Sequence, residues 1–213
     1  QARGQTKAEM YYLIGRKKLE ADGNTEAALR ELAVQARAIG KYDESIDLWK
    51  RYITVNPGSY LPYFNMSGCY FEKEEFEEAF RHAKKAFELN RESKEAVQCY
   101  AVTSLFRADP GDAIGVLEDL LQRIPPYPTG RMTLATACCV TGMRDKGIRH
   151  LREMREAGYD CSEVLYNLSV KFLAAGKSAS AIALLECMQE SGHVHADGER
   201  LLQESYDALA VGA

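Results

Sequence analysis

The hydrophobic positions between Gly40 and Pro57 follow the spacing of an amphipathic helix. Small and apolar residues recur there at steps of three and four, which places them on one face: Ser45, Ile46, Trp49, Tyr52 and Ile53. Gly40 interrupts the chain before this helix, and Pro57 ends it. The stretch is therefore predicted to form a turn followed by one helix with a single buried face.

The same pattern returns every thirty-four residues along the chain. Counting from Ile46, the matching residues are all large and apolar: Phe80, Ile114, Ile148 and Ile182. Counting from Ser45, they are all small: Ala79, Ala113, Gly147 and Ala181. A fixed period of this length is typical of a repeat protein, in which each unit stacks on the next.

A second pair of positions keeps the same contrast of size. From Glu26 the register holds without insertion or deletion, and new units begin at Tyr60, Lys94, Pro128, Ser162 and Ala196. The seventh residue of each unit is large: Leu32, Met66, Tyr100, Leu134 and Leu168. The eighth is small: Ala33, Ser67, Ala101, Ala135 and Ser169. We predict that this small residue meets the small residue at the twentieth position, so that two helix axes approach closely.

This pattern resembles the tetratricopeptide repeat family, whose units carry W-x2-L-G-x2-Y, A-x3-F and P over thirty-four residues. The unit from Glu26 supplies Leu29, Leu32, Ala33, Ala36, Gly40, Tyr42, Ser45, Trp49, Tyr52 and Pro57. The unit from Tyr60 supplies Tyr63, Met66, Ser67, Tyr70, Phe76, Ala79, Ala83 and Ala86. Later units keep the sizes but drift, with Arg131 at the tryptophan position. The resemblance covers residues 26–195 and implies an all-α fold, a right-handed α-solenoid of five 34-residue helix-turn-helix repeats.

The two ends are expected to differ from the five repeats. Residues 1–25 contain a helix over 7–21, either the second half of an incomplete repeat or the first helix of a repeat completed by the next helix. Residues 196–213 are predicted to form a capping helix and tail, because an apolar stripe stands opposite a polar one. Trp49 and Tyr52 are expected to hold units together rather than touch a ligand.

The segment 125–128 contains three prolines and separates repeats 26–124 from repeats 125–195. Proline removes a backbone donor and restricts the residue before it to extended conformations. Two interpretations remain open: a stiff turn between repeats, or a hinge between two rigid halves.

Composition narrows the class of function. The 213 residues carry a net charge of -4, which argues against binding nucleic acid, and no apolar run reaches the length of a membrane-spanning helix. The six cysteines show no CxxC pair, so we expect buried apolar thiols in a reducing compartment, the cytoplasm. A membrane surface would be reached only through a partner.

No catalytic, cofactor or metal motif is present. The sequence lacks a glycine-rich phosphate loop, GxSxG and HExxH, so we predict no enzyme and no cofactor. His193 and His195 have no carboxylate or cysteine at ligand spacing, which disfavours a metal site. His82 and His150 share the twenty-third position of their units, where we expect solvated surface residues.

The resemblance implies that the first helix of each repeat lines a concave groove and that the second helices form the convex surface. The predicted groove residues are Arg30, Val34, Arg37, Leu61, Phe64, Asn65, Phe71, Gln98, Val102, Phe106, Met132, Tyr166 and Asn167. The predicted convex docking residues are Arg81, His82, Lys84, Lys85, Arg149 and Arg152. Aromatic and methionine anchors in a groove suit an amphipathic helix or an apolar peptide. Alternatively, several of these side chains pack on neighbouring helices and leave a shallower groove.

Some family members grip a C-terminal carboxylate with a clamp of lysine, arginine and asparagine. The aligned residues here are Arg30, Val34, Asn65, Glu95 and Cys99, of which only Arg30 and Asn65 fit that role. Glu95 would repel a carboxylate. We therefore predict no tight binding to the acidic tails of chaperones.

Two functions follow. The first is a non-enzymatic scaffold that binds a protein or peptide in the groove. The second is self-assembly into a homo-oligomer, in which the incomplete N-terminal repeat enters a neighbour's groove. Bacterial scaffolds of about this size serve secretion and pilus assembly, and one coats a membrane organelle, the magnetosome, by oligomerising.

Overall fold

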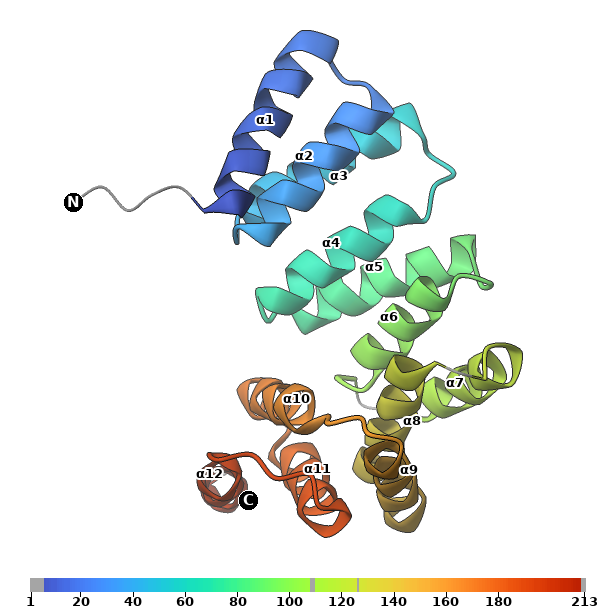
Figure 1. Cartoon of the computed structure of the whole chain (residues 1–213), viewed down its shortest axis with the longest axis vertical. Helices are drawn as coiled ribbons and strands as arrows, with labels where there is room; N and C mark the ends of the chain where they lie inside the picture. Colours follow the sequence, from blue (N-terminus) through green and yellow to red (C-terminus); the bar gives the residue numbers. More distant parts are fainter. Residues whose placement is uncertain (1–5, 108–109, 126, 212–213) are drawn as a thin grey trace, which may run out of the picture. The chain divides into compact units, whose positions relative to one another are not determined.

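The computed structural model describes residues 6–107, 110–125 and 127–211, and the side chain of residue 112 is not among the described parts. Figure 1 shows that these residues form helices joined by short turns, and none of them lies in a strand. The chain divides into two compact units, Gln1–Cys99 and Tyr100–Ala213, and we describe each by itself. The all-α class predicted from the sequence is therefore confirmed.

The described residues of the first unit, 6–99, form five helices and the start of a sixth. Their bounds are α1 (Lys7–Asp22), α2 (Glu26–Ala38), α3 (Tyr42–Val55), α4 (Leu61–Glu72), α5 (Phe76–Leu89) and α6 (Lys94–Ser104), the last of which crosses into the second unit. Thr6 begins α1 with a capping box, in which its hydroxyl accepts from the Glu9 amide and Glu9 reaches back to the Thr6 amide. Pairs α2/α3 and α4/α5 pack as helix hairpins.

The small positions meet inside each hairpin as the sequence predicts. Ser45 Oγ in α3 donates to the backbone oxygen of Ala33 in α2 at 2.8 Å. Ser67 Oγ in α4 donates to the oxygen of Ala79 in α5 at 2.7 Å. All four residues have no exposed surface, so a side chain larger than serine at these positions would push the two helices apart.

The turn between the two helices of a repeat requires a left-handed residue. Gly40, Gly142 and Gly176 have φ values of 76°, 83° and 70°, and Glu74 occupies the matching position with a φ of 61°. In each turn the amide of the next residue reaches back across the helix end, as Lys41 N does to Ala36 O at 2.9 Å. Glu74 is the one described residue other than glycine with a positive φ.

Trp49 and Tyr52 lie in the core of the first unit. Each is 1% exposed, and their rings meet edge to face with centroids 5.4 Å apart. The Tyr52 hydroxyl donates to the Glu26 carboxylate at the start of α2. The expectation that these two residues are framework rather than ligand contacts agrees with their burial.

The second unit continues the alternation of first and second helices. Its remaining helices are α7 (Gly111–Arg123), α8 (Pro128–Val140), α9 (Arg144–Glu156), α10 (Ser162–Ala174), α11 (Ser178–Ser191) and α12 (Gly198–Val211). The first helices α2, α4, α6, α8 and α10 begin 33 to 35 residues apart, close to the predicted period. Lys177 Nζ donates to the Arg107 backbone oxygen at 2.6 Å and joins segments seventy residues apart.

Pro125 and Pro128 lie inside the second unit, where α7 packs against α8. Pro126, part of the predicted hinge, falls outside the described residues. The ring of Tyr127 lies over Gly130 in the first turn of α8, 2.5 Å from where a Cβ on that glycine would be. A larger residue at position 130 would displace this ring.

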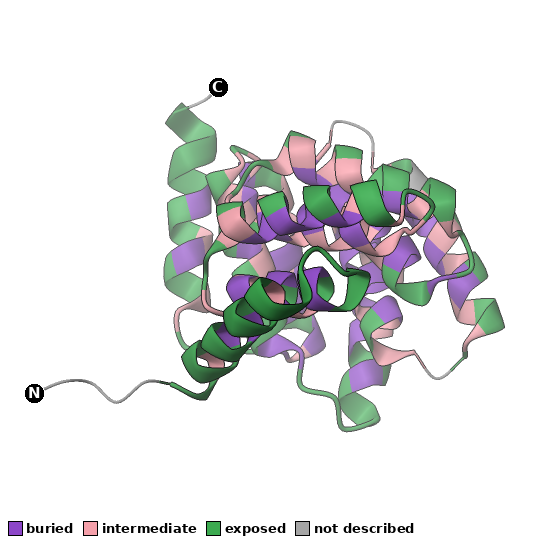
Figure 2. Cartoon of the chain, turned by 90° about the horizontal axis from the view of Figure 1, so that it is seen from above, coloured by how far each residue is buried: buried purple, intermediate pink, exposed green. Residues whose placement is uncertain are grey.

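The terminal helices are the least buried parts of the chain, as Figure 2 shows next to both termini. In α1 only Tyr12 and Gly15 are buried, and Gly15 lies against Leu32 of α2. Tyr12 also donates a hydrogen bond to Glu44 at 2.7 Å. In α12 the buried residues are Leu201 and Ser205, which agrees with a cap that has one apolar and one exposed face.

Candidate protein-binding surfaces

The first-helix face of unit 1 is formed by the predicted groove residues of α2 and α4. On α4 these residues recur at steps of three and four, which places them around Gly68 on one side of the helix: Leu61, Phe64, Asn65 and Phe71. All four are partly exposed, whereas Met66 and Ser67 on the opposite side are fully buried. The same helix therefore buries its framework residues and presents the others.

On α2 the corresponding residues form a stripe along one side of the helix, in which one apolar side chain lies between two positively charged ones. Arg30, Val34 and Arg37 are spaced by four and three residues. Val34 is 44% exposed, Arg30 is exposed and Arg37 is partly buried. Two positive groups thus flank one exposed apolar side chain.

Asn65 has one of its hydrogen-bonding groups already engaged. Its Nδ2 donates to the Leu61 backbone oxygen at 2.9 Å, one turn earlier in α4. The carbonyl oxygen and the second N–H of the side chain remain as groups that Asn65 can offer to a partner.

The start of α6 contacts α4 next to this surface. Gln98 and Cys99 are partly buried, and Cys99 Sγ donates to Ser67 Oγ at 3.2 Å. Burial raises the pKa of the Cys99 thiol to about 11, so this group is neutral at physiological pH. The same arrangement occurs one repeat earlier, where Cys69 Sγ donates to Ser45 Oγ at 3.5 Å.

In the second unit, two predicted groove aromatics are covered by other parts of the chain. Phe106 is only 6% exposed and stacks on Phe172 of α10 with centroids 4.5 Å apart. It therefore belongs to the core, contrary to the expectation that it lines a groove. Val102 and Met132 are partly buried.

Tyr166 is covered by a histidine from the loop before α12. The rings of Tyr166 and His195 are nearly parallel, with centroids 3.7 Å apart, and His195 Nε2 lies 3.1 Å from the Glu163 carboxylate. Asn167 is exposed, and its Nδ2 donates to Glu163 at 3.1 Å. The alternative in which several groove residues pack within the chain thus holds for Phe106 and, in part, for Tyr166.

The predicted convex residues are exposed with one exception. Arg81, Lys84, Lys85, Arg149 and Arg152 are all exposed, although Arg81 pairs with Glu78 and Arg152 donates to the Glu190 backbone oxygen at 3.0 Å. The exception is His82. It lines a cavity of about 390 Å³ with Tyr63, the three basic residues of α5 and Glu88.

The prediction that His82 and His150 are solvated is wrong. Their side chains are only 12% and 19% exposed, and His82 stacks on Tyr70 with centroids 5.1 Å apart. Burial lowers the pKa of His82 to about 4 and also lowers the pKa of His150. Both imidazoles are therefore neutral at pH 7.

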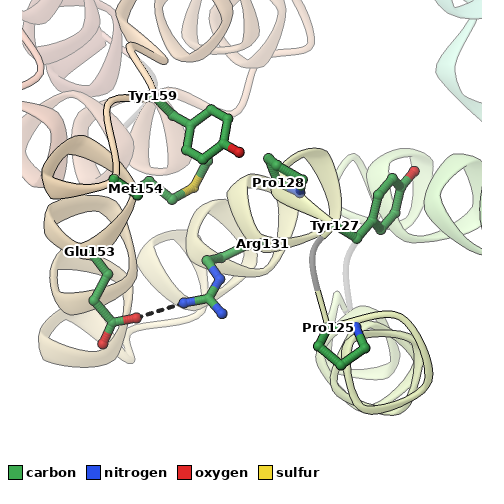
Figure 3. Close-up of a pocket in the computed structure, with 8 residues that line it drawn as sticks. Pro125, Tyr127, Pro128, Arg131, Glu153, Met154 and Tyr159 are labelled. Carbon is green, nitrogen blue, oxygen red and sulfur yellow. Dashed lines mark hydrogen bonds and ion pairs between the residues drawn. The ribbon is translucent and has the colours of Figure 1, made fainter.

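A further cavity of about 230 Å³ lies in the second unit, between the start of α8 and the end of α9. Arg131 and Glu153, which both line it, form an ion pair at 2.9 Å. Figure 3 shows this pair together with Met154 and Tyr159, which also line the cavity. Because this pair neutralises its own charges, the cavity offers a mainly apolar recess.

Within the described residues no three His, Cys, Asp or Glu side chains could together hold a metal ion. His193 is 2% exposed, lies 3.2 Å from Ser191 Oγ through Nδ1, and has a pKa lowered by burial. All six cysteines are free, and all but Cys99 are buried.

The arrangement of paired helices, left-handed turns and small contact residues defines an all-α solenoid of the tetratricopeptide repeat type. Solved structures show the same fold. YrrB, a TPR protein, has a TM-score of 0.60 at 13% identity and covers 91% of this chain and 97% of its own. A tetratricopeptide repeat protein from Parabacteroides merdae has a TM-score of 0.65 at 13% identity over 94% and 78% of the two chains. MamA has a TM-score of 0.59 at 18% identity over 74% of this chain and all of its own.

Sequence comparison adds no closer relationship. No family model matches the chain, and no curated protein matches its sequence. The likeness is therefore one of fold. In the part of the chain that the structure describes, no helix has both the length and the apolar character needed to cross a bilayer.

Proposed function

We propose that this protein is a non-enzymatic scaffold that binds a peptide or an amphipathic helix on the first-helix face. The observation that carries the proposal is the contrast within α4, where Phe64 and Phe71 stay partly exposed while the framework residues Met66, Ser67 and Cys69 are buried. Exposed aromatic side chains on a structured face are typical anchors for a partner.

Neighbouring side chains add polar groups to this apolar surface. Arg30 and Arg37 stand on α2, and the carbonyl oxygen of Asn65 stands on α4. An interface of this composition combines apolar burial with a few directed hydrogen bonds. YrrB, which shares the fold, is described as a TPR protein with an unusual peptide-binding site.

Selection from a random twelve-residue peptide display library on the immobilised full chain tests the proposal. We expect selected peptides to bind the wild-type chain and to lose about tenfold in affinity when Phe64→Ala removes an anchor. Lys85→Ala on α5 is the matched control, because Lys85 is exposed on the second-helix surface. Loss of binding with Lys85→Ala and not with Phe64→Ala would overturn the proposed site.

A second candidate function is self-assembly through α1. Met10 and Ile14 are each 51% exposed, and Tyr11 beside them is also exposed, so α1 presents an apolar strip. A surface of this kind is buried at low cost against a second copy of the chain. MamA is a structural neighbour of the same fold.

Substitution on the exposed strip tests self-assembly better than truncation. Deleting residues 1–24 would uncover Leu32, which lies against Gly15, and would create a new apolar surface. Ile14→Glu keeps α1 in place. If the chain self-assembles through α1, light scattering during size-exclusion chromatography should show a mass above 23.8 kDa for the wild type and a monomer for Ile14→Glu. A wild-type monomer at high concentration would exclude this candidate.

A further inference from the structure

Arg37 crosses from α2 to α4 and occupies the space that a side chain at position 68 would fill. A Cβ placed on Gly68 would lie 2.7 Å from Nη2 of Arg37 and 2.8 Å from Cζ. Real Cβ atoms do not approach other atoms that closely, so glycine at this position allows the guanidinium to lie directly on the backbone of α4. Gly68 thus provides a seat for Arg37.

The seated guanidinium has no partner within the described part of the chain. Arg37 is partly buried, and no ion pair or hydrogen bond joins it to another described group. Other arginines differ, since Arg81 pairs with Glu78 and Arg131 with Glu153. A guanidinium carries five N–H donors in a planar fork that matches a carboxylate.

The surroundings of Arg37 favour a strong interaction with an anion. Its positive charge reaches the thiols of Cys69 and Cys99 and lowers their pKa values, although burial has the larger and opposite effect. Both thiols are neutral at pH 7, so neither of them pairs with the guanidinium as an anion. Phe64 and Phe71 stand on the same side of α4 as Gly68, which makes the neighbourhood apolar.

Arg30 adds a second positive group on the same stripe of α2. It lies seven residues before Arg37, which corresponds to about 10 Å along a helix. Arg30 also has no ion pair or hydrogen bond within the described residues. Val34 lies between the two arginines and is exposed.

Resting on the scaffold function proposed above, we propose that the first-helix face of unit 1 recognises an acidic peptide. A glutamate or aspartate side chain of the peptide pairs with Arg37 over Gly68, and a second carboxylate about 10 Å away reaches Arg30. An apolar side chain between the two carboxylates packs on Val34. The partner is thus a segment with the order acidic, apolar, acidic.

This site differs in place from the carboxylate clamp of the family. Arg37 lies in the last turn of α2 and is not one of the clamp-aligned positions. Glu95, which is expected to repel a terminal carboxylate, lies in the first turn of α6. The acidic group recognised by Arg37 is a side chain within a peptide rather than the end of a chain.

The test begins with the peptides selected from the random display library. We expect aspartate and glutamate to be enriched at least twofold over the input library among peptides that bind the wild-type chain. One selected acidic peptide is then synthesised with a fluorescent label, together with a counterpart in which each glutamate is replaced by glutamine and each aspartate by asparagine. Fluorescence anisotropy gives the dissociation constant of each peptide for each variant.

Three variants separate charge from position. Arg37→Gln is expected to weaken the acidic peptide about tenfold and to leave the neutral counterpart unchanged. Gly68→Ala keeps every charge but unseats the guanidinium, so it should also weaken the acidic peptide. Arg16→Gln removes an exposed arginine of α1 that has no ion pair among the described residues, and it should change neither affinity.

The outcomes distinguish this inference from the scaffold function. Selected peptides without acidic enrichment, or an acidic peptide that binds Arg37→Gln as tightly as the wild type, would overturn the acidic specificity and leave the scaffold function standing. Failure to select any peptide would overturn both. Weakening of the acidic peptide by Arg37→Gln and Gly68→Ala, but not by Arg16→Gln, would support both.

Discussion

The hydroxyl of Ser67 in α4 donates a hydrogen bond of 2.7 Å to the backbone oxygen of Ala79 in α5. It accepts another from Cys99 Sγ in α6 at 3.2 Å. Three consecutive helices of the first unit are therefore joined at one buried point. The contact depends on two residues small enough for the helix backbones to approach each other.

Enlarging one of these residues should destabilise the chain. Ala79→Leu adds three carbon atoms at a position with no exposed surface, so we expect a loss of about 1–3 kcal/mol in the free energy of unfolding, measured by urea denaturation. Ala38→Leu, at an exposed position of α2, should change stability by less than about 0.5 kcal/mol. Equal effects of the two substitutions would show that close approach at Ala79 is not what stabilises the hairpin.

Glu74 is held in a left-handed conformation that costs a side-chain-bearing residue free energy. Glu74→Gly should raise the free energy of unfolding by about 0.5–1 kcal/mol, because the turn already has the shape that glycine adopts in the matching turns. Gly40→Ala is the reverse control and should lower it by about 1 kcal/mol. Destabilisation by Glu74→Gly would mean that contacts of the glutamate outweigh the backbone strain.

Two glycines in second helices should respond oppositely to alanine. A Cβ on Gly147 would lie 2.4 Å from Cys139 Sγ and 3.0 Å from the Ala135 backbone oxygen, whereas a Cβ on Gly115 would meet nothing within 4 Å. We expect Gly147→Ala to lower the melting temperature, because the added methyl group overpacks the contact. Gly115→Ala should raise the melting temperature, because alanine favours the helix over glycine by about 1 kcal/mol in free energy. The same sign for both changes would argue against a close helix contact at Gly147.

Because of His82, the free energy of unfolding should decrease as the pH is lowered through the mildly acidic range. The folded-state pKa is about 4 and the ordinary value is 6.5, so the unfolded chain binds a proton between these pH values and the folded chain does not. No effect is expected above pH 6.5. Stability falls from there to pH 4, by roughly 1–2 kcal/mol given the partial solvent contact of the ring.

The variant His82→Phe isolates this contribution, because a phenyl ring keeps the stacking on Tyr70 but does not titrate. The free energy of unfolding of the variant should lose less on acidification from pH 6.5 to pH 4 than that of the wild type. Nearby Arg81, Glu78 and Lys50 remain in both proteins. Parallel pH profiles would show that burial of His82 does not control its protonation.

The buried contacts between the two helices of a repeat could be predicted, because they depend on residues at fixed positions of the repeated sequence pattern. A small residue at Ser67 and another at Ala79 each occupy fixed places in a repeated pattern, and the pattern itself identifies the helix contact. The left-handed turn at Gly40 is signalled by a glycine that recurs at Gly142 and Gly176. Such features need no knowledge of which side chains from other repeats lie nearby.

Which of the predicted groove and convex side chains are exposed was harder to predict, because their exposure depends on residues from other helices that cover them. Phe106 is buried by Phe172, two repeats further along the chain, and Tyr166 is covered by His195, twenty-nine residues later at the end of its own repeat. His82 occupies an outward position, but Tyr70 from the preceding helix covers its ring. Helical periodicity gives the direction of a side chain and not what lies on top of it.

The seat of Arg37 on Gly68 could have been suspected from the sequence, since a glycine interrupts an otherwise well-formed helix face. In a helix interior, glycine costs about 1 kcal/mol relative to alanine, and such a cost often has a structural reason. The reason here is an arginine contributed by the preceding repeat. Period analysis alone could not connect the two, because they occupy different positions in their units.

The hydrogen bonds that join Ala33 to Ser45 and Ala79 to Ser67 lie on the buried sides of the first helices, whereas Val34 and Phe64 lie on the sides of α2 and α4 that remain exposed or partly exposed. Residues such as Val34 and Phe64 can therefore be exchanged with little effect on the scaffold that carries them. The binding specificity of this chain can therefore change in evolution faster than its fold. A designer could equally rewrite the binding preference by altering only the exposed positions of α2 and α4.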